Sequence, residues 1–105
     1  MTAEADERVR QVRAARAELH ARGPKRRRPF DGDFERVALP EADGDVLRDM
    51  LVAHGARTVI EVGLAYGSSA LAIGEALCVT GGTNALHIVI DPFQATAYDL
   101  SLIHI

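Results

Sequence analysis

The first hydrophobic pattern in the chain is a narrow apolar stripe with helical spacing. Residues 3–22 are rich in Ala, Arg and Glu, which are good helix formers. Val9, Val12 and Leu19 fall at helical spacing among charged positions. The Gly23-Pro24 pair then ends the pattern. We therefore predict an amphipathic helix that is weakly tethered to the rest of the chain.

A second helical pattern covers residues 40–54 and ends before Gly55, a residue suited to the left-handed conformation that closes helices. Its apolar stripe consists of Val46, Leu47, Met50 and Leu51. The segment "GPKRRRPFDGDF" between the two helices contains two prolines and two glycines among charges, which predicts a linker.

Two short runs rich in β-branched residues flank a third helical pattern. "TVIEV" at 58–62 and "LHIVID" at 86–91 are typical of parallel strands buried on both faces. Between them a helix starts near Ser68, with Ser68 or Ser69 as its cap. Its predicted apolar face consists of Ala70, Leu71, Ile73, Ala76 and Leu77. Strand, helix and strand in this order predict a βαβ unit and an α/β fold.

Charge is distributed unevenly along the 105 residues. Residues 1–36 hold ten Lys/Arg and seven Asp/Glu, whereas residues 37–105 hold two and eight. The second part is therefore a poor match for a nucleic-acid backbone. The basic run at 25–28 is compatible with nucleic acid or an acidic partner, but a solvated linker is the favoured interpretation, so we expect no nucleic-acid partner.

Other features favour a cytoplasmic protein without a metal site. Cys78 is the single cysteine, so an intramolecular disulfide is excluded. The N-terminal segment lacks the apolar region of a secretory signal, and no apolar run is long enough to span a membrane. The four histidines show no metal-ligand spacing.

The stretch "EVGLAYGSS" joins the first predicted strand to the helix, where ligands bind in open α/β sheets. Gly63 permits a sharp turn, and Gly67 leaves room for a ligand beside the main chain. The N–H groups of Gly67, Ser68 and Ser69 would face outward at a helix N-terminus and attract a carboxylate or phosphate.

Two carboxylates extend this candidate site. Asp91 ends the second strand, where an acid can accept hydrogen bonds from a ribose diol, and Glu61 offers a negative charge to a cation. The dinucleotide fingerprint Gly-x-Gly-x-x-Gly is not met, because Ala65 occupies its second glycine position. S-adenosylmethionine carries a carboxylate, an ammonium, a sulfonium and a ribose, and it suits both carboxylates and the helix terminus.

The segments "VIEVGLAYGSSALAIGEAL" and "HIVIDPF" resemble the first βαβ unit of class I S-adenosylmethionine-dependent methyltransferases. Within this family, the resemblance is nearest to the small-molecule O-methyltransferase-like branch. The resemblance covers residues 47–93. It implies a Rossmann-like methyltransferase fold, truncated after the first βαβ unit and preceded by N-terminal helices. It also implies S-adenosyl-L-methionine as cofactor and a small-molecule methyl acceptor.

In that family Gly63 and Gly67 would line the methionine part of the cofactor, and Ser69 would bond its carboxylate. Glu61 would lie near the amine, and Asp91 would hold the ribose hydroxyls, with the next two residues beside the adenine edge. The tyrosine of the loop either stacks near the sulfonium or is an exposed loop residue. The candidate cofactor-binding residues are therefore Glu61, Gly63, Ala65, Tyr66, Gly67, Ser68, Ser69, Asp91, Pro92 and Phe93.

The domain organisation that these observations predict is that of a fragment. Residues 1–36 are an N-terminal helix and basic linker, and 37–97 are the N-terminal part of a cofactor-binding domain. Residues 98–105 resemble translated adaptor read-through and are expected to be non-native. Two parallel strands are too few for a stable sheet, and catalytic residues would lie beyond residue 105. The expected function is the cofactor-binding half of a methyltransferase, inactive alone; the alternatives are an NAD-dependent oxidoreductase fragment and a non-enzymatic interaction module.

Overall fold

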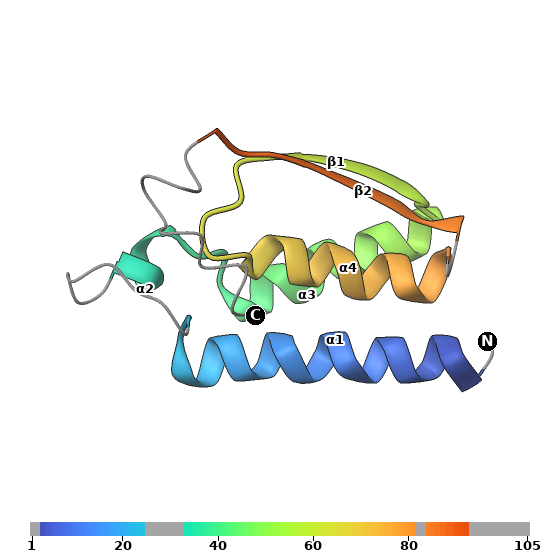
Figure 1. The fold of residues 1–105 in the computed structure, drawn as a ribbon, viewed down its shortest axis with the longest axis horizontal. Helices are drawn as coiled ribbons and strands as arrows, with labels where there is room; N and C mark the ends of the chain where they lie inside the picture. Colours follow the sequence, from blue (N-terminus) through green and yellow to red (C-terminus); the bar gives the residue numbers. More distant parts are fainter. Residues whose placement is uncertain (1–2, 25–32, 82–83, 93–105) are drawn as a thin grey trace.

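The computed structural model describes residues 3–24, 33–81 and 84–92. Their elements, in chain order, are α1 (Ala3–Arg22), α2 (Asp33–Val37), α3 (Glu41–His54), β1 (Thr58–Val62), α4 (Ser68–Thr80) and β2 (Leu86–Ile90). Figure 1 shows them in layers, with the two strands over α3 and α4 and with α1 on the far side of α4. The basic run at 25–28 and the tail at 98–105 lie outside the described residues.

The long predicted helices are confirmed. α1 spans residues 3–22 as expected, and α3 begins directly after Pro40. Gly55 ends α3 in the left-handed conformation, with φ of 64°, and its N–H bonds to the last-turn carbonyls of Leu51 and Val52. A glycine is favoured there because a Cβ would be strained at positive φ.

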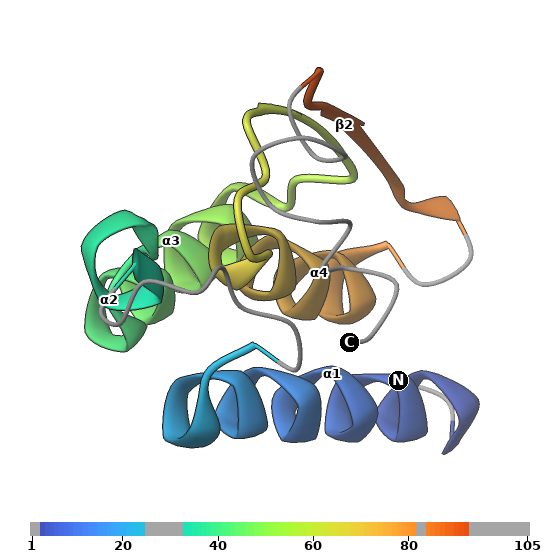
Figure 2. The same ribbon diagram turned by 60° about the vertical axis from the view of Figure 1, so that its left-hand side comes forward.

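Helix α2 was not predicted, because it overlaps the end of the segment taken as a linker. With five residues it is too short to show a helical period. Phe34 fixes it in place: its side chain is buried in a cluster with Leu19 of α1 and Tyr66 of the β1–α4 loop. Figure 2 shows α2 beside the N-terminal end of α3. The segment before α3 is thus tied to the core.

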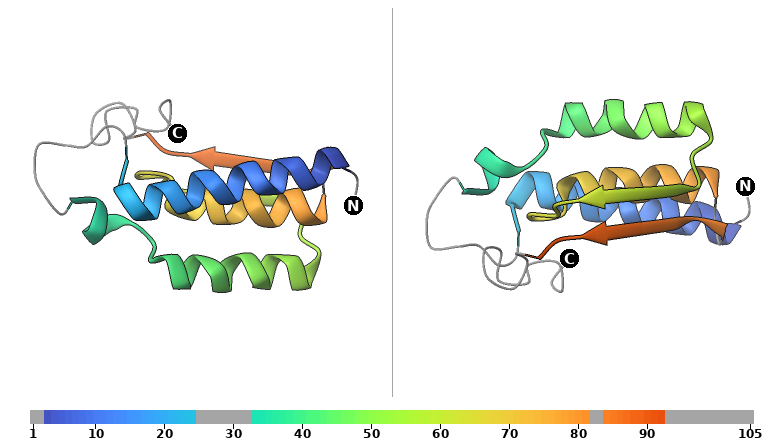
Figure 3. Two further views of the ribbon diagram at one scale, coloured as in Figure 1. Left: turned by 90° about the horizontal axis from the view of Figure 1, so that it is seen from below. Right: turned by 90° about the horizontal axis from the view of Figure 1, so that it is seen from above.

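The βαβ unit is confirmed, and the fold is a mixed helix and strand arrangement around a two-stranded parallel sheet. β1 pairs with β2 so that Val59 faces His87 and Glu61 faces Val89. The ladder continues one step beyond β1, where the Gly63 N–H donates to the Ile90 carbonyl at 2.8 Å. Figure 3 shows both strands lying over α4, so their carboxyl ends meet beside its N-terminus.

The expectation that both strands are buried on both faces is wrong. Val59 and Glu61 are half-buried toward the helices, but Ile60 is 63% exposed and Val62 is 78% exposed on the other face. Leu86, Ile88 and Ile90 of β2 are exposed as well. The reason is that α3 and α4 lie on one side of the sheet, and no described element covers the opposite side (Figure 1).

The expectation of a weakly tethered first helix is also wrong, because α1 packs along α4 (Figure 2). Ala5, Val9 and Leu19 of α1 are buried. Arg13 adds an ion pair to the buried Glu75 of α4, with 2.9 Å between Nε and Oε2. The thin apolar stripe is thus supplemented by charged side chains. None of the helices described is both long and apolar enough to cross a membrane.

Candidate functional site

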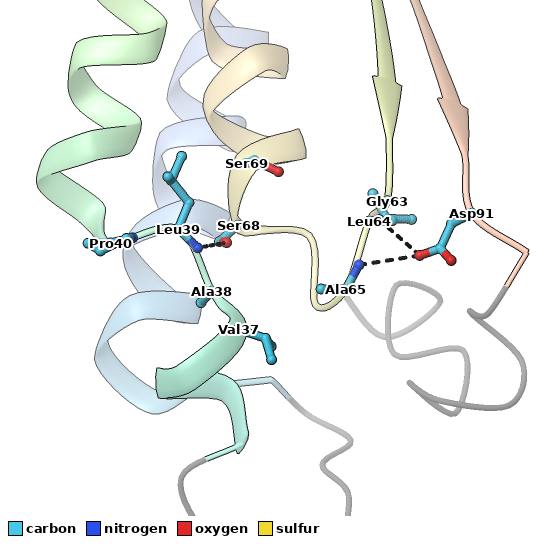
Figure 4. A pocket seen from close by; sticks show the side chains of 10 residues that line it. All are labelled: Val37, Ala38, Leu39, Pro40, Gly63, Leu64, Ala65, Ser68, Ser69 and Asp91. Carbon is cyan, nitrogen blue, oxygen red and sulfur yellow. Dashed lines mark hydrogen bonds between the residues drawn. The ribbon is translucent and has the colours of Figure 1, made fainter.

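A cavity of about 510 Å³ opens at the carboxyl ends of the two strands (Figure 4). Its walls come from the end of α2 and its link to α3, from the β1–α4 loop with the first turn of α4, and from the residue after β2. The lining residues are Val37, Ala38, Leu39, Pro40, Gly63, Leu64, Ala65, Ser68, Ser69 and Asp91. Small-molecule sites occupy about 300–1,000 Å³ and lie at this edge of parallel sheets, so both size and place suit a ligand.

The β1–α4 loop reaches the cavity through unusual backbone conformations. Gly63, Ala65 and Gly67 have positive φ values of 84°, 50° and 91°. A hydrogen bond from the Gly67 N–H to the Leu64 carbonyl, at 2.9 Å, closes the turn. Gly67 therefore does not present its N–H outward as the sequence suggested. Ala65 is the one non-glycine with positive φ in the described parts of the chain, and strain of this kind clusters at functional sites.

The Asp91 side chain points at this loop, as expected if the glycine-containing loop and the acid after β2 belong to one site. Its Oδ2 accepts hydrogen bonds from the N–H groups of Leu64, at 2.9 Å, and Ala65, at 3.3 Å. The contact joins the end of β2 to the bend after β1 (Figure 4). A ribose diol bound here would share the carboxylate with two main-chain amides.

The first turn of α4 lines one side of the cavity through Ser68 and Ser69. Its N-cap is Gly67, which has no side chain to cap the helix, so the expectation of a serine cap is wrong. Ser68 is instead buried, and its hydroxyl accepts a hydrogen bond from the Leu39 N–H at 3.0 Å. The first N–H groups of an α-helix have no partner within the helix and carry partial positive charge. This end of the cavity therefore favours an anionic group.

Glu61 does not line the cavity. It lies between the sheet and α4, with its side chain 9% exposed. Its Oε2 accepts a hydrogen bond from the Ser69 hydroxyl, and its Oε1 lies 3.1 Å from His87 Nε2. Ser69, which does line the cavity, therefore links this carboxylate to it by a hydrogen bond.

Tyr66 occupies neither of its expected places. Tyr66 is 1% exposed and is not among the cavity-lining residues. The interpretation of Tyr66 as an exposed loop residue is therefore wrong, and its ring does not face the cavity. Its ring packs edge-on against Phe34, with 5.8 Å between centroids. The loop turn directs it inward, because α2 and α1 supply apolar surface there. Pro92 is exposed and does not line the cavity, and Phe93 lies outside the described residues.

Sequence reasoning missed the wall formed by residues 37–40. The signal was present as the uncharged run "VALP" between charged segments, but an apolar run before a helix does not reveal what it faces. Within the described ranges, no group of three or more His, Cys, Asp or Glu is arranged to hold a metal ion. Asp91 is the one charged side chain of the described cavity lining.

The chain matches no protein-family model, no curated protein and no solved structure. Function is therefore inferred from the chemistry of the site.

Proposed function

We propose that the cavity binds S-adenosyl-L-methionine and that the chain is the cofactor-binding half of a class I methyltransferase with a Rossmann-like fold. The observation that carries the proposal is the contact of Asp91 with the loop amides of Leu64 and Ala65. It brings the second-strand acid and the glycine bend, which lie far apart in sequence, to one cavity at the ends of adjacent parallel strands.

The polarity of the lining suits a zwitterionic nucleoside better than a dinucleotide. A pyrophosphate would bring two negative charges beside Asp91, with no Lys or Arg among the described lining residues to balance them. The single carboxylate of an amino-acid moiety needs only the partial positive charge of the α4 N-terminus. Its sugar hydroxyls would donate to Asp91.

The chain's own part in the reaction is positioning. S-adenosylmethionine supplies an activated methyl group, which an oxygen, nitrogen or carbon of a small-molecule acceptor would attack by in-line displacement. The α4 N-terminus would hold the carboxylate of the cofactor, and Asp91 would hold its ribose hydroxyls. The apolar wall at Val37, Ala38 and Leu39 would exclude water from one side. None of the chain's residues is assigned a proton-transfer role.

Titration of the chain by calorimetry with S-adenosylhomocysteine, and separately with NAD, tests the proposal. We expect saturable binding of the nucleoside and none of NAD. Asp91→Asn should weaken binding about tenfold or more, because hydrogen bonds to a charged acceptor contribute about 1.5–3 kcal/mol. Asp49→Asn is the matched control, since its side chain is 68% exposed on α3 and is not part of the cavity lining.

A nicotinamide-dependent oxidoreductase is the second candidate. The observation in its favour is Ala65, which occupies the second glycine position of the dinucleotide fingerprint and has a left-handed backbone that glycine adopts most readily. Binding of NAD without any response to S-adenosylhomocysteine would favour it over our proposal. A chain that folds cooperatively and binds neither compound would support the third alternative, a non-enzymatic interaction module.

A further inference from the structure

A chain of three polar side chains runs from beneath the sheet to the cavity. His87 of β2 and Glu61 of β1 lie on the sheet face that α4 covers, and Ser69 belongs to the first turn of α4. His87 pairs with Val59 in the ladder, so it is the diagonal neighbour of Glu61. The side chains of His87 and Glu61 are 19% and 9% exposed. Two strands and a helix therefore meet in one hydrogen-bonded unit.

The chemistry of these groups fixes the direction of the hydrogen bonds. An ionised carboxylate can only accept, so Ser69 donates its hydroxyl proton to Oε2 of Glu61, and His87 donates from Nε2 to Oε1. With its proton turned toward Glu61, the Ser69 oxygen keeps only acceptor lone pairs for the cavity. It is therefore suited to a cationic donor.

On the basis of the proposed function, we propose that His87 is a positioning residue for recognition of the cofactor's ammonium. His87 holds Glu61, Glu61 orients the Ser69 hydroxyl, and the Ser69 oxygen accepts a hydrogen bond from the ammonium. The buried negative charge of Glu61 strengthens that acceptor. This assigns Ser69 to the amine of the amino-acid moiety rather than to its carboxylate, which is left to the main-chain amides at the start of α4.

Without His87, the carboxylate of Glu61 would lose one of its two described donors while remaining largely buried. A buried acceptor left with fewer partners seeks others. Glu61 would then turn toward Ser69 or toward solvent, and the Ser69 oxygen would lose its fixed orientation. The loss would affect ligands that carry the amine and spare those that lack it.

The test compares S-adenosylhomocysteine with its desamino analogue by calorimetry on the full chain. His87→Leu and Ser69→Ala should each weaken S-adenosylhomocysteine about three- to tenfold, as expected for one hydrogen bond. His87→Gln keeps a side-chain N–H donor and should bind within twofold of the unsubstituted chain. All of these variants should bind the desamino analogue equally. His54→Leu, an exposed histidine at the end of α3, is the matched control.

The double variant decides whether His87 acts through Ser69. In a chain already carrying Ser69→Ala, His87→Leu should have no further effect on affinity. An additive effect, or equal weakening of the desamino analogue, would overturn the inference. If His87→Leu does not give a cooperative thermal unfolding transition, His87→Ala, which also lacks a side-chain donor, replaces it with the same expectations. A lack of S-adenosylhomocysteine binding by the unsubstituted chain would instead contradict the proposed function, and the inference with it.

Discussion

Ala65 is a strained residue at the mouth of the cavity. Its φ of 50° lies in the left-handed region, where a Cβ crowds the following carbonyl. The flanking turn forces the conformation: the Gly67 N–H bonds to the Leu64 carbonyl, and Asp91 binds the Ala65 N–H. The same contacts that shape the cavity thus hold this residue in an unfavourable conformation.

Replacing Ala65 with glycine should therefore stabilise the fold. Relief of the left-handed strain of about 1–2 kcal/mol exceeds the added chain entropy of about 0.5–1 kcal/mol, so the free energy of unfolding should rise by about 0.5–1 kcal/mol. Urea denaturation measures it. Ala14→Gly, at an exposed position in the middle of α1, should instead lower stability by about 1 kcal/mol. Equal losses in both variants would show that Ala65 is not strained.

At the scale of elements, three helices meet around one buried carboxylate. Glu75 of α4 is 1% exposed and lies within 4 Å of three guanidinium groups, those of Arg13, Arg16 and Arg48. Arg16 of α1 is itself buried and pairs with Asp45 of α3 at 2.7 Å. The helix layers are thus joined by charges as well as by apolar contacts.

Removing the Glu75 charge should weaken the packing of α1 and α3 on α4 more than any surface ion pair does. Glu75→Gln leaves the buried Arg16 with Asp45 as its remaining described acidic partner, so the loss should approach but stay below the cost of an uncompensated buried charge, about 3–5 kcal/mol. Glu18→Gln, which removes an exposed pair with Arg22 on α1, should cost less than about 1 kcal/mol. Urea midpoints measure both effects. Similar losses would show that the buried network adds little stability.

The elements also show what sequence could and could not predict. Long periodic segments such as α1, α3 and α4 were predicted closely, because periodicity and a C-terminal glycine act locally. The meeting of Asp91 with the glycine loop was predictable, because adjacent parallel strands end at one edge. The inward turn of Tyr66, the pairing of Glu61 with Ser69 and the exposure of the outer sheet face among the described residues were not predictable. Each depends on which distant element supplies a partner, and hydrophobicity alone does not specify that.

At the scale of the whole molecule, the helix layer and the sheet are buried to different extents. α4 is surrounded by α1, α3 and the sheet, and its Ala72 and Ala76 are fully buried. Among the described elements, the sheet has helices on one face only, and Ile60, Val62 and Ile90 each remain at least half exposed on the other. The core therefore lies between the helices rather than in the sheet, and the stability of the molecule should depend mainly on helix contacts.

One such contact should make the stability of the whole molecule depend on pH. His20 of α1 is half-buried, and its ring lies 6.1 Å from that of Phe34, which joins α1, α2 and the β1–α4 loop. Burial lowers the pKa of His20 below its ordinary value; Arg16 adds to the effect, and Glu41 and Asp45 oppose it. Because the unfolded chain keeps the ordinary pKa, it binds more protons than the folded chain below about pH 6.5.

The stabilising effect of a neutral His20 is therefore present above about pH 6.5 and is lost as the pH falls through the lower pKa of the folded state. We expect the urea midpoint of the chain to fall between pH 7.5 and pH 5.5, and the fall to be smaller in His20→Gln. His54→Gln, at an exposed position in α3, should follow the unsubstituted chain and so removes the contribution of a solvated histidine. Parallel curves for all three proteins would show that His20 is not coupled to folding, and that its contact with Phe34 tolerates a charged ring.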